Sequence, residues 1–166
     1  MYSMDSDDQS LDDMHKLLKI LLKDFNRICY ITLNKSGESV KEFCKENDID
    51  FKKIVVVDMI SSRFRKCQSE DSIFYSDLID LEQNFKEVIN LIEKEKCDAL
   101  ILDSLSTMQI YYSESEILKF VHKLLVYTQG PHIIVNLIIY KEDVKREWVK
   151  VILPMVGKIK EIKFDR

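Results

Sequence analysis

Asp103 is the residue in this chain whose setting most clearly suggests chemistry. It follows the apolar run 99–102 and precedes the hydroxyl-rich segment 104–107. This pattern predicts a buried parallel strand that delivers a carboxylate to the C-terminal edge of a sheet, which is where ligands bind in open α/β sheets. A carboxylate at that edge, with Ser104 beside it, could hold the magnesium ion of a bound nucleotide.

The other half of a nucleotide site is missing from the sequence. No GxxxxGK[ST] segment occurs, and the only glycines are Gly37, Gly130 and Gly157. A phosphate-binding loop needs glycine-permitted backbone N–H groups and a lysine. Two other roles for Asp103 therefore stay open. It could order the turn 104–107 by hydrogen bonds to backbone N–H groups, or accept a phosphoryl group as receiver-domain aspartates do.

Two further groups of residues could contact a ligand or partner. Arg63 and Arg65 lie in the polar segment 61–72 with aromatic neighbours, a composition that suits phosphate or single-stranded nucleic acid but also an ordinary solvated loop. Tyr111 and Tyr112 could stack on a ligand or partner, or one of them could pack inward. The four cysteines and three histidines show no metal-ligand spacing, so we expect no metal site.

Bulk composition limits the class of protein. A length of 166 residues predicts a single domain over 1–166, with a flexible acidic start at 1–9. The net charge of −4 offers no general affinity for nucleic acid or a membrane. The apolar run 133–140 is too short to cross a bilayer, and the acidic start is unlike a secretory signal. We therefore expect a cytoplasmic protein.

Strands and helices alternate along the chain. Short apolar runs predict strands at 28–33, 54–58, 73–75, 99–103 and 133–140, and an edge strand at 158–164. Helical spacing predicts helices at 11–25 with Ser10 as N-cap, at 38–46, at 81–94, from the capping box of Ser113 and Glu116 to Gly130, and at 144–152. The alternation predicts an α/β three-layer sandwich with a mostly parallel sheet.

The order of these motifs resembles that of the RecA/KaiC-like ATPases, in particular archaeal KaiC-like, recombinase-related proteins. The matching span is 14–163. It includes the helix ending at Phe25, the strand segment 28–35, the segment 47–50, the strand ending in Asp58, and a Walker B-like strand over 98–106. The resemblance implies the P-loop NTPase fold, with a central strand directly before the phosphate-binding loop.

The departures from that family fall at its catalytic positions. Segment 4–13 stands where the P-loop is expected, but it has no glycine or lysine and carries five carboxylates. Like charges ~5 Å apart repel by roughly 1–3 kcal/mol each, so this segment would repel a triphosphate. Asn34 and Lys35 replace the family's catalytic glutamate, and neither is a general base at neutral pH. Only residues 1–4 remain to supply the central first strand, so either a strand stub forms, the sheet closes up, or another chain covers the gap.

These observations predict a catalytically inactive ATPase-like domain that acts as a regulatory or protein-interaction module, with no catalytic residue and no cofactor. Its expected partner is a protein, either a second copy or an intact ATPase relative. One alternative is a divergent ATPase that holds ATP and magnesium through Asp103 and Ser104. Another is an accessory protein in DNA recombination or repair. The expected ligand or partner contacts are Asn34, Lys35, Arg63, Arg65, Tyr111 and Tyr112.

Overall fold

The computed structural model describes residues 1–4, 9–61, 72–76, 80–130, 133–156 and 160–161. The strands are β1 (Tyr2–Met4), β2 (Ile28–Thr32), β3 (Ile54–Asp58), β4 (Ile73–Tyr75), β5 (Ala99–Asp103), β6 (Ile134–Tyr140) and β7 (Lys160–Glu161). The α-helices are α1 (Gln9–Asp24), α2 (Gly37–Glu46), α3 (Leu81–Glu95), α4 (Leu105–Met108), α5 (Glu114–Gln129) and α6 (Glu147–Ile152), with short 3-10 turns η1 (Phe51–Lys53) and η3 (Lys141–Asp143).

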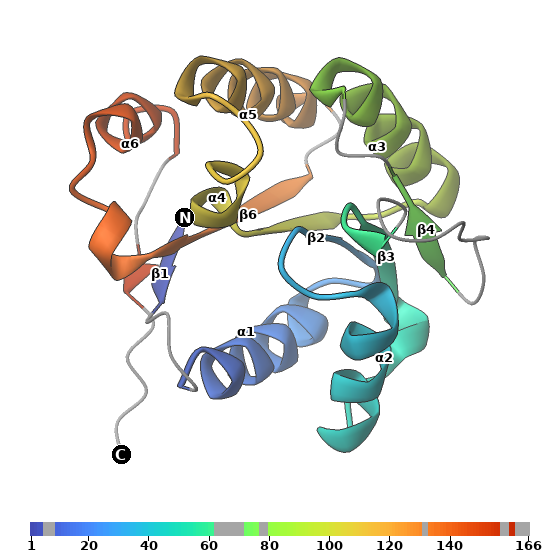
Figure 1. The fold of residues 1–166 in the computed structure, drawn as a ribbon. Helices are drawn as coiled ribbons and strands as arrows, with labels where there is room; N and C mark the ends of the chain where they lie inside the picture. Colours follow the sequence, from blue (N-terminus) through green and yellow to red (C-terminus); the bar gives the residue numbers. More distant parts are fainter. Residues whose placement is uncertain (5–8, 62–71, 77–79, 131–132, 157–159, 162–166) are drawn as a thin grey trace.

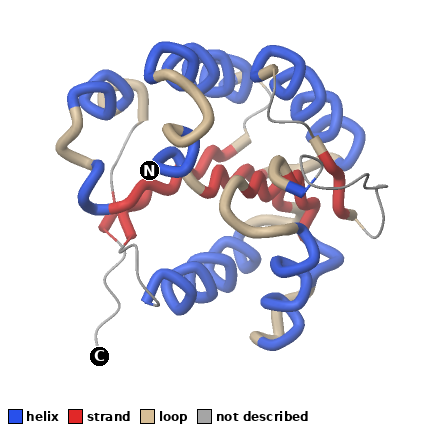
Figure 2. Tube along the Cα trace, viewed as in Figure 1, coloured by secondary structure: helices blue, strands red, loops and turns tan. Residues whose placement is uncertain are grey.

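The strands form one sheet in the order β4-β3-β2-β5-β6-β1-β7, and each described pairing is parallel. Helices α3, α4, α5 and α6 cover one face, while α1 and α2 cover the other (Figure 1). The strands run through the middle as a single layer between the two helical layers (Figure 2). The predicted three-layer α/β sandwich is therefore confirmed, and its sheet is parallel throughout the described residues.

Side-chain alternation along the central strands builds a separate core on each face. In β2, Cys29 and Ile31 belong to the core under α3, α5 and α6, whereas Ile28 and Tyr30 belong to the core against α1 and α2. Strands β3 and β5 alternate in the same way, because side chains of a strand point to opposite faces in turn. By this alternation Asp58 and Asp103, each the last residue of its strand, lie on the α1/α2 face.

The first residues of the chain correct one prediction. The interpretation of 1–9 as a start without regular structure is wrong for Tyr2–Met4, which pair with β6 and with β7 as strand β1. The first of the three outcomes for the central strand, a short strand stub, is the observed one. Residues 5–8 lie outside the described residues.

Helix boundaries differ from the predictions at a few ends. Helix α1 already includes Gln9 and Ser10, so Ser10 is not its N-cap. The final helix is shorter than predicted, because residues 144–146 form a turn after the 3-10 turn η3 and α6 begins only at Glu147. The capping box of Ser113 and Glu116 at the start of α5 is confirmed.

Gly37 fixes how closely α2 approaches the sheet. It is the first residue of α2, and a Cβ atom at this position would collide with Cγ2 of Ile73 on strand β4. The glycine therefore lets the start of the helix pack against the strand pair β3–β4. No described helix is long and apolar enough to cross a membrane.

Candidate functional site

Asp103 lies at the C-terminal end of β5, in the middle of the sheet, and the residue is only 4% exposed. One carboxylate oxygen, Oδ2, accepts a hydrogen bond of 2.5 Å from the Tyr30 hydroxyl. The other, Oδ1, accepts one of 3.2 Å from Nδ2 of Asn34. Tyr30 lies one diagonal step from Asp103, because Thr32 is the register partner of Asp103 and side chains two apart share a face. Both carboxylate oxygens therefore have partners inside the protein.

Burial dominates the electrostatics of this group of residues. It raises the pKa of the Asp103 carboxyl, while the bonds from Tyr30 and Asn34 and the charge of Lys35 act in the opposite direction. Burial, with Asp103 next to it, raises the pKa of the Tyr30 hydroxyl well above its ordinary value. Burial also lowers the pKa of Lys35, although the Asp103 charge partly restores it. Tyr30 therefore stays protonated and works as a hydrogen-bond donor.

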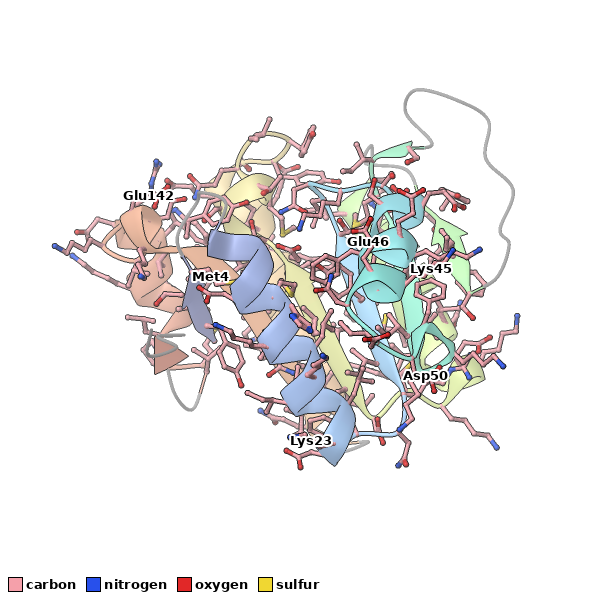
Figure 3. All side chains as sticks on the ribbon, turned by 90° about the horizontal axis from the view of Figure 1, so that it is seen from below. Met4, Lys23, Lys45, Glu46, Asp50 and Glu142 are labelled. Atoms are coloured by element: carbon pink, nitrogen blue, oxygen red, sulfur yellow. The ribbon has the colours of Figure 1, made fainter. Side chains whose placement is uncertain are left out.

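A cavity of about 200 Å³ opens beside Asp103 on the α1/α2 face. It is lined by Met4, Met14, Asn34, Lys35, Asp103, Ile138 and Tyr140. Figure 3 views this face from below and shows Met4, at the end of β1, beside the first turns of α1. The sheet order brings the ends of β1, β2, β5 and β6 together here, so residues far apart in sequence share one small pocket.

Two hydrogen-bond donors of this pocket, the Lys35 ammonium and the Tyr140 hydroxyl, remain available to a ligand as far as the described residues show. The Lys35 ammonium makes no ion pair within the described part of the chain, although its Nζ lies 5.6 Å from the centre of the Phe43 ring. The Tyr140 hydroxyl accepts a bond of 3.3 Å from Nδ2 of Asn34, which leaves its own proton available. The arrangement can therefore donate hydrogen bonds into the cavity from Lys35 and Tyr140, beside the Asp103 carboxyl whose pKa burial raises.

The role predicted for Asp103 as the organiser of the turn 104–107 is wrong. Ser104 performs that role, because its hydroxyl oxygen accepts from the backbone N–H of Thr107 at 3.1 Å. Ser104 is fully buried and its hydroxyl also pairs with that of Thr107 at 2.9 Å. The Ser104 side chain is thus committed to capping α4, rather than to a ligand in the cavity.

Asp58, at the end of β3, is the carboxylate that organises backbone N–H groups. Its Oδ1 accepts from the N–H groups of Ile60 and Ser61, both at 2.9 Å. Its Oδ2 accepts from the Gly37 N–H at 2.7 Å and from the Ser61 hydroxyl at 2.6 Å. Asp58 is completely buried and joins β3, the turn after it and the start of α2. The sequence identified it only as an acid ending a strand.

The remaining predicted contact residues lie elsewhere. Tyr112 is 9% exposed and packs in the core, whereas Tyr111 is half-buried at its edge, with the two ring centres 6.5 Å apart. One tyrosine therefore packs inward and the other lies nearer the surface, as one of the two interpretations stated. Arg63 and Arg65 lie outside the described residues. Within the described residues no three His, Cys, Asp or Glu side chains form a group that could hold a metal ion.

No protein-family model matches the sequence, and the search among curated proteins finds no match. Among solved structures, the chain is similar to a KaiC-like protein from the hyperthermophilic archaeon Pyrococcus horikoshii OT3. The TM-score is 0.58 at 11% sequence identity, and the match covers 81% of this chain and 56% of the other. The chain thus spans little more than half the length of that protein. Together with the parallel sheet, this similarity shows that the chain has a RecA/KaiC-like α/β fold.

Proposed function

We propose that this chain is a catalytically inactive domain with an ATPase-type fold, which works as a regulatory or protein-interaction module. The hydrogen bonding of Asp103 carries the proposal. In a P-loop ATPase the acid at this position helps to hold magnesium. Here both oxygens of the buried carboxylate accept hydrogen bonds from Tyr30 and Asn34, and a metal ion would have to displace those donors.

The residues around Asp103 also fit nucleotide hydrolysis poorly. Asn34 and Lys35 follow the end of the neighbouring strand β2, where the family has a catalytic glutamate. An amide cannot take a proton from water, and the Lys35 amine would first have to lose its own. Asn34 and Lys35 therefore offer no ready general base, and the Asp103 carboxylate that also lines the cavity already accepts hydrogen bonds from Tyr30 and Asn34.

The size of the cavity supports the same conclusion. Sites for drug-sized ligands and cofactors usually enclose about 300–1,000 Å³, and the pocket beside Asp103 measures about 200 Å³. Met4, Met14 and Ile138 supply apolar walls where a triphosphate would need donors. ATP with magnesium thus does not fit the described residues.

The alternative of a divergent nucleotide-binding protein draws support from one observation. The Lys35 ammonium lines the cavity and makes no ion pair within 4 Å among the described residues, although the charge of Asp103 acts on it, and such a cation could bind a phosphate group. This alternative and the inactive-domain proposal predict different effects on ATP turnover when the Asp103 carboxylate is removed. Only a working ATPase would lose turnover when Asp103 can no longer help to hold magnesium.

A phosphate-release assay separates the two proposals. We expect the protein, incubated with millimolar ATP and magnesium, to release no more phosphate than a sample without protein. The Asp103→Asn variant, which keeps the shape of the side chain, is the matched control and should give the same background. Release that needs magnesium and disappears in Asp103→Asn would refute the inactive domain and establish the divergent ATPase.

A further inference from the structure

The cavity beside Asp103 contains one positive and one negative group that do not pair with each other. Lys35 and Asp103 both line it, and the Asp103 charge acts on the Lys35 ammonium, yet no ion pair within 4 Å joins the two. Burial acts against both charges, because it raises the pKa of the Asp103 carboxyl and lowers the pKa of the Lys35 ammonium. A ligand with one charge of each sign could therefore replace the water that both groups lose on folding.

The polar groups around these two charges leave room for further hydrogen bonds. An ionised carboxylate has about four lone-pair positions, and among the described residues the Asp103 side chain accepts from Tyr30 and Asn34 only. The Tyr140 hydroxyl accepts from Asn34 at 3.3 Å, so its own proton can be donated to a ligand. The cavity thus offers acceptor positions at Asp103, and donors at Lys35 and Tyr140.

Apolar side chains form the rest of the cavity wall. Met4 from β1, Met14 from α1 and Ile138 from β6 line it, and all three are buried. The volume of about 200 Å³ is below the usual range for drug-sized ligands, about 300–1,000 Å³. Because methionine side chains are flexible, this part of the wall can adjust to a small aliphatic group. The cavity therefore suits a small molecule that has an apolar part as well as charged groups.

From this arrangement we propose that the cavity binds a free α-amino acid with a short aliphatic side chain. The ligand carboxylate meets Lys35 and Tyr140, the ligand ammonium meets Asp103, and the aliphatic side chain packs against Met4 and Met14. Asp103 would repel a simple anion and Lys35 a simple cation, whereas a zwitterion satisfies both charges. An α-amino acid carries its two charges on neighbouring carbon atoms, which keeps the ligand small enough for this cavity. The inference rests on the proposed regulatory role, and it names the class of molecule that the domain would sense.

Calorimetric titration of matched small molecules into the full chain tests this inference. The probes are free valine and free leucine, each compared with two fragments of itself. One fragment is the amine that lacks the carboxylate, and the other is the carboxylic acid that lacks the ammonium. We expect at least one of the amino acids to bind about tenfold or more tightly than both of its fragments, because hydrogen bonds between charged groups are the strong ones.

Variants that remove one charge at a time assign each contact. Lys35→Met should abolish the advantage of the amino acid over the amine, because the ligand carboxylate then has no cation to meet. Asp103→Asn, which keeps the shape of the side chain, should abolish the advantage over the carboxylic acid. Lys45→Met is the matched control, since Lys45 is exposed on α2 outside the cavity and is labelled in Figure 3. It should keep both preferences.

The possible outcomes are distinct. If neither amino acid binds at millimolar concentration, if a fragment binds as tightly as its amino acid, or if Lys35→Met keeps both preferences, the inference is overturned. Circular dichroism of each variant checks that it folds before its affinity is compared. Magnesium-dependent phosphate release by the same preparation would refute the inactive-domain proposal, yet it would leave a measured amino-acid preference standing.

Discussion

Asp58→Ala is expected to lower the free energy of unfolding by about 3–5 kcal/mol. The carboxylate accepts four hydrogen bonds at a fully buried position, three of them from backbone N–H groups. A buried donor that loses its acceptor costs about 1–3 kcal/mol, and costs at neighbouring groups do not add fully. Since domains are stable by only about 5–15 kcal/mol, this change removes a large part of the total. Urea denaturation, followed by circular dichroism, measures it.

Asp50→Ala is the matched control. Asp50, labelled in Figure 3, is an exposed N-cap whose Oδ1 accepts a bond from Lys52 N–H at 3.1 Å. Loss of such a cap costs about 1 kcal/mol. If Asp58→Ala cost no more than Asp50→Ala, Asp58 would not be the junction between β3 and α2 described above.

Asp103→Ala should cost about 1–3 kcal/mol, because it leaves the buried Tyr30 hydroxyl without its acceptor. Asp103→Asn should cost less, since the amide oxygen can still accept from Tyr30. In a double-mutant cycle with Tyr30→Phe, the two losses should overlap by at least about 0.5 kcal/mol. Strictly additive losses in denaturant titrations would show that the two side chains do not act together.

The pH dependence of the same pair gives an independent check. Burial raises the pKa of Asp103 in the folded protein, so the folded state holds this proton more tightly than the unfolded state does. The contribution to stability is therefore present below the unfolded value of about 3.9 and is lost as pH rises through the folded pKa. The free energy of unfolding of the natural protein, relative to Asp103→Asn, should fall as pH rises above about 4. If this difference in the free energy of unfolding did not change with pH, the pKa of Asp103 would not be raised by folding.

The arrangement of layers could be predicted from the sequence because it depends on local patterns. Short apolar runs such as 99–102 are typical of buried strands, and their alternation with amphipathic helices favours a parallel sheet. Strand β1 could not be found in this way, since Tyr2–Met4 is too short to show periodicity. It is a strand because β6 and β7 flank it on both sides, which is a tertiary effect.

The candidate site was predictable only in part. The sequence predicts that Asn34, Lys35 and Asp103 lie close together, because neighbouring parallel strands end at the same edge of the sheet. Asp58 and Asp103 look alike in sequence, as acids that end apolar strands, yet one binds backbone N–H groups and the other binds Tyr30 and Asn34. The difference comes from the neighbours, because Asp58 faces the start of α2 and Asp103 faces Tyr30 on the adjacent strand. Strand register, which a single sequence does not specify, decides between them.

We propose that this domain, although it has an ATPase-type fold, does not bind ATP with magnesium. Calorimetric titration of ATP and magnesium into the protein tests it most directly, with a thermal-shift measurement under the same conditions. We expect no heat beyond dilution and no rise in melting temperature. A ligand present at 100 times its dissociation constant would stabilise the protein by about 2.7 kcal/mol, an effect too large to miss. Saturable, magnesium-dependent heat that is lost in Asp103→Asn would contradict the proposal of an inactive domain.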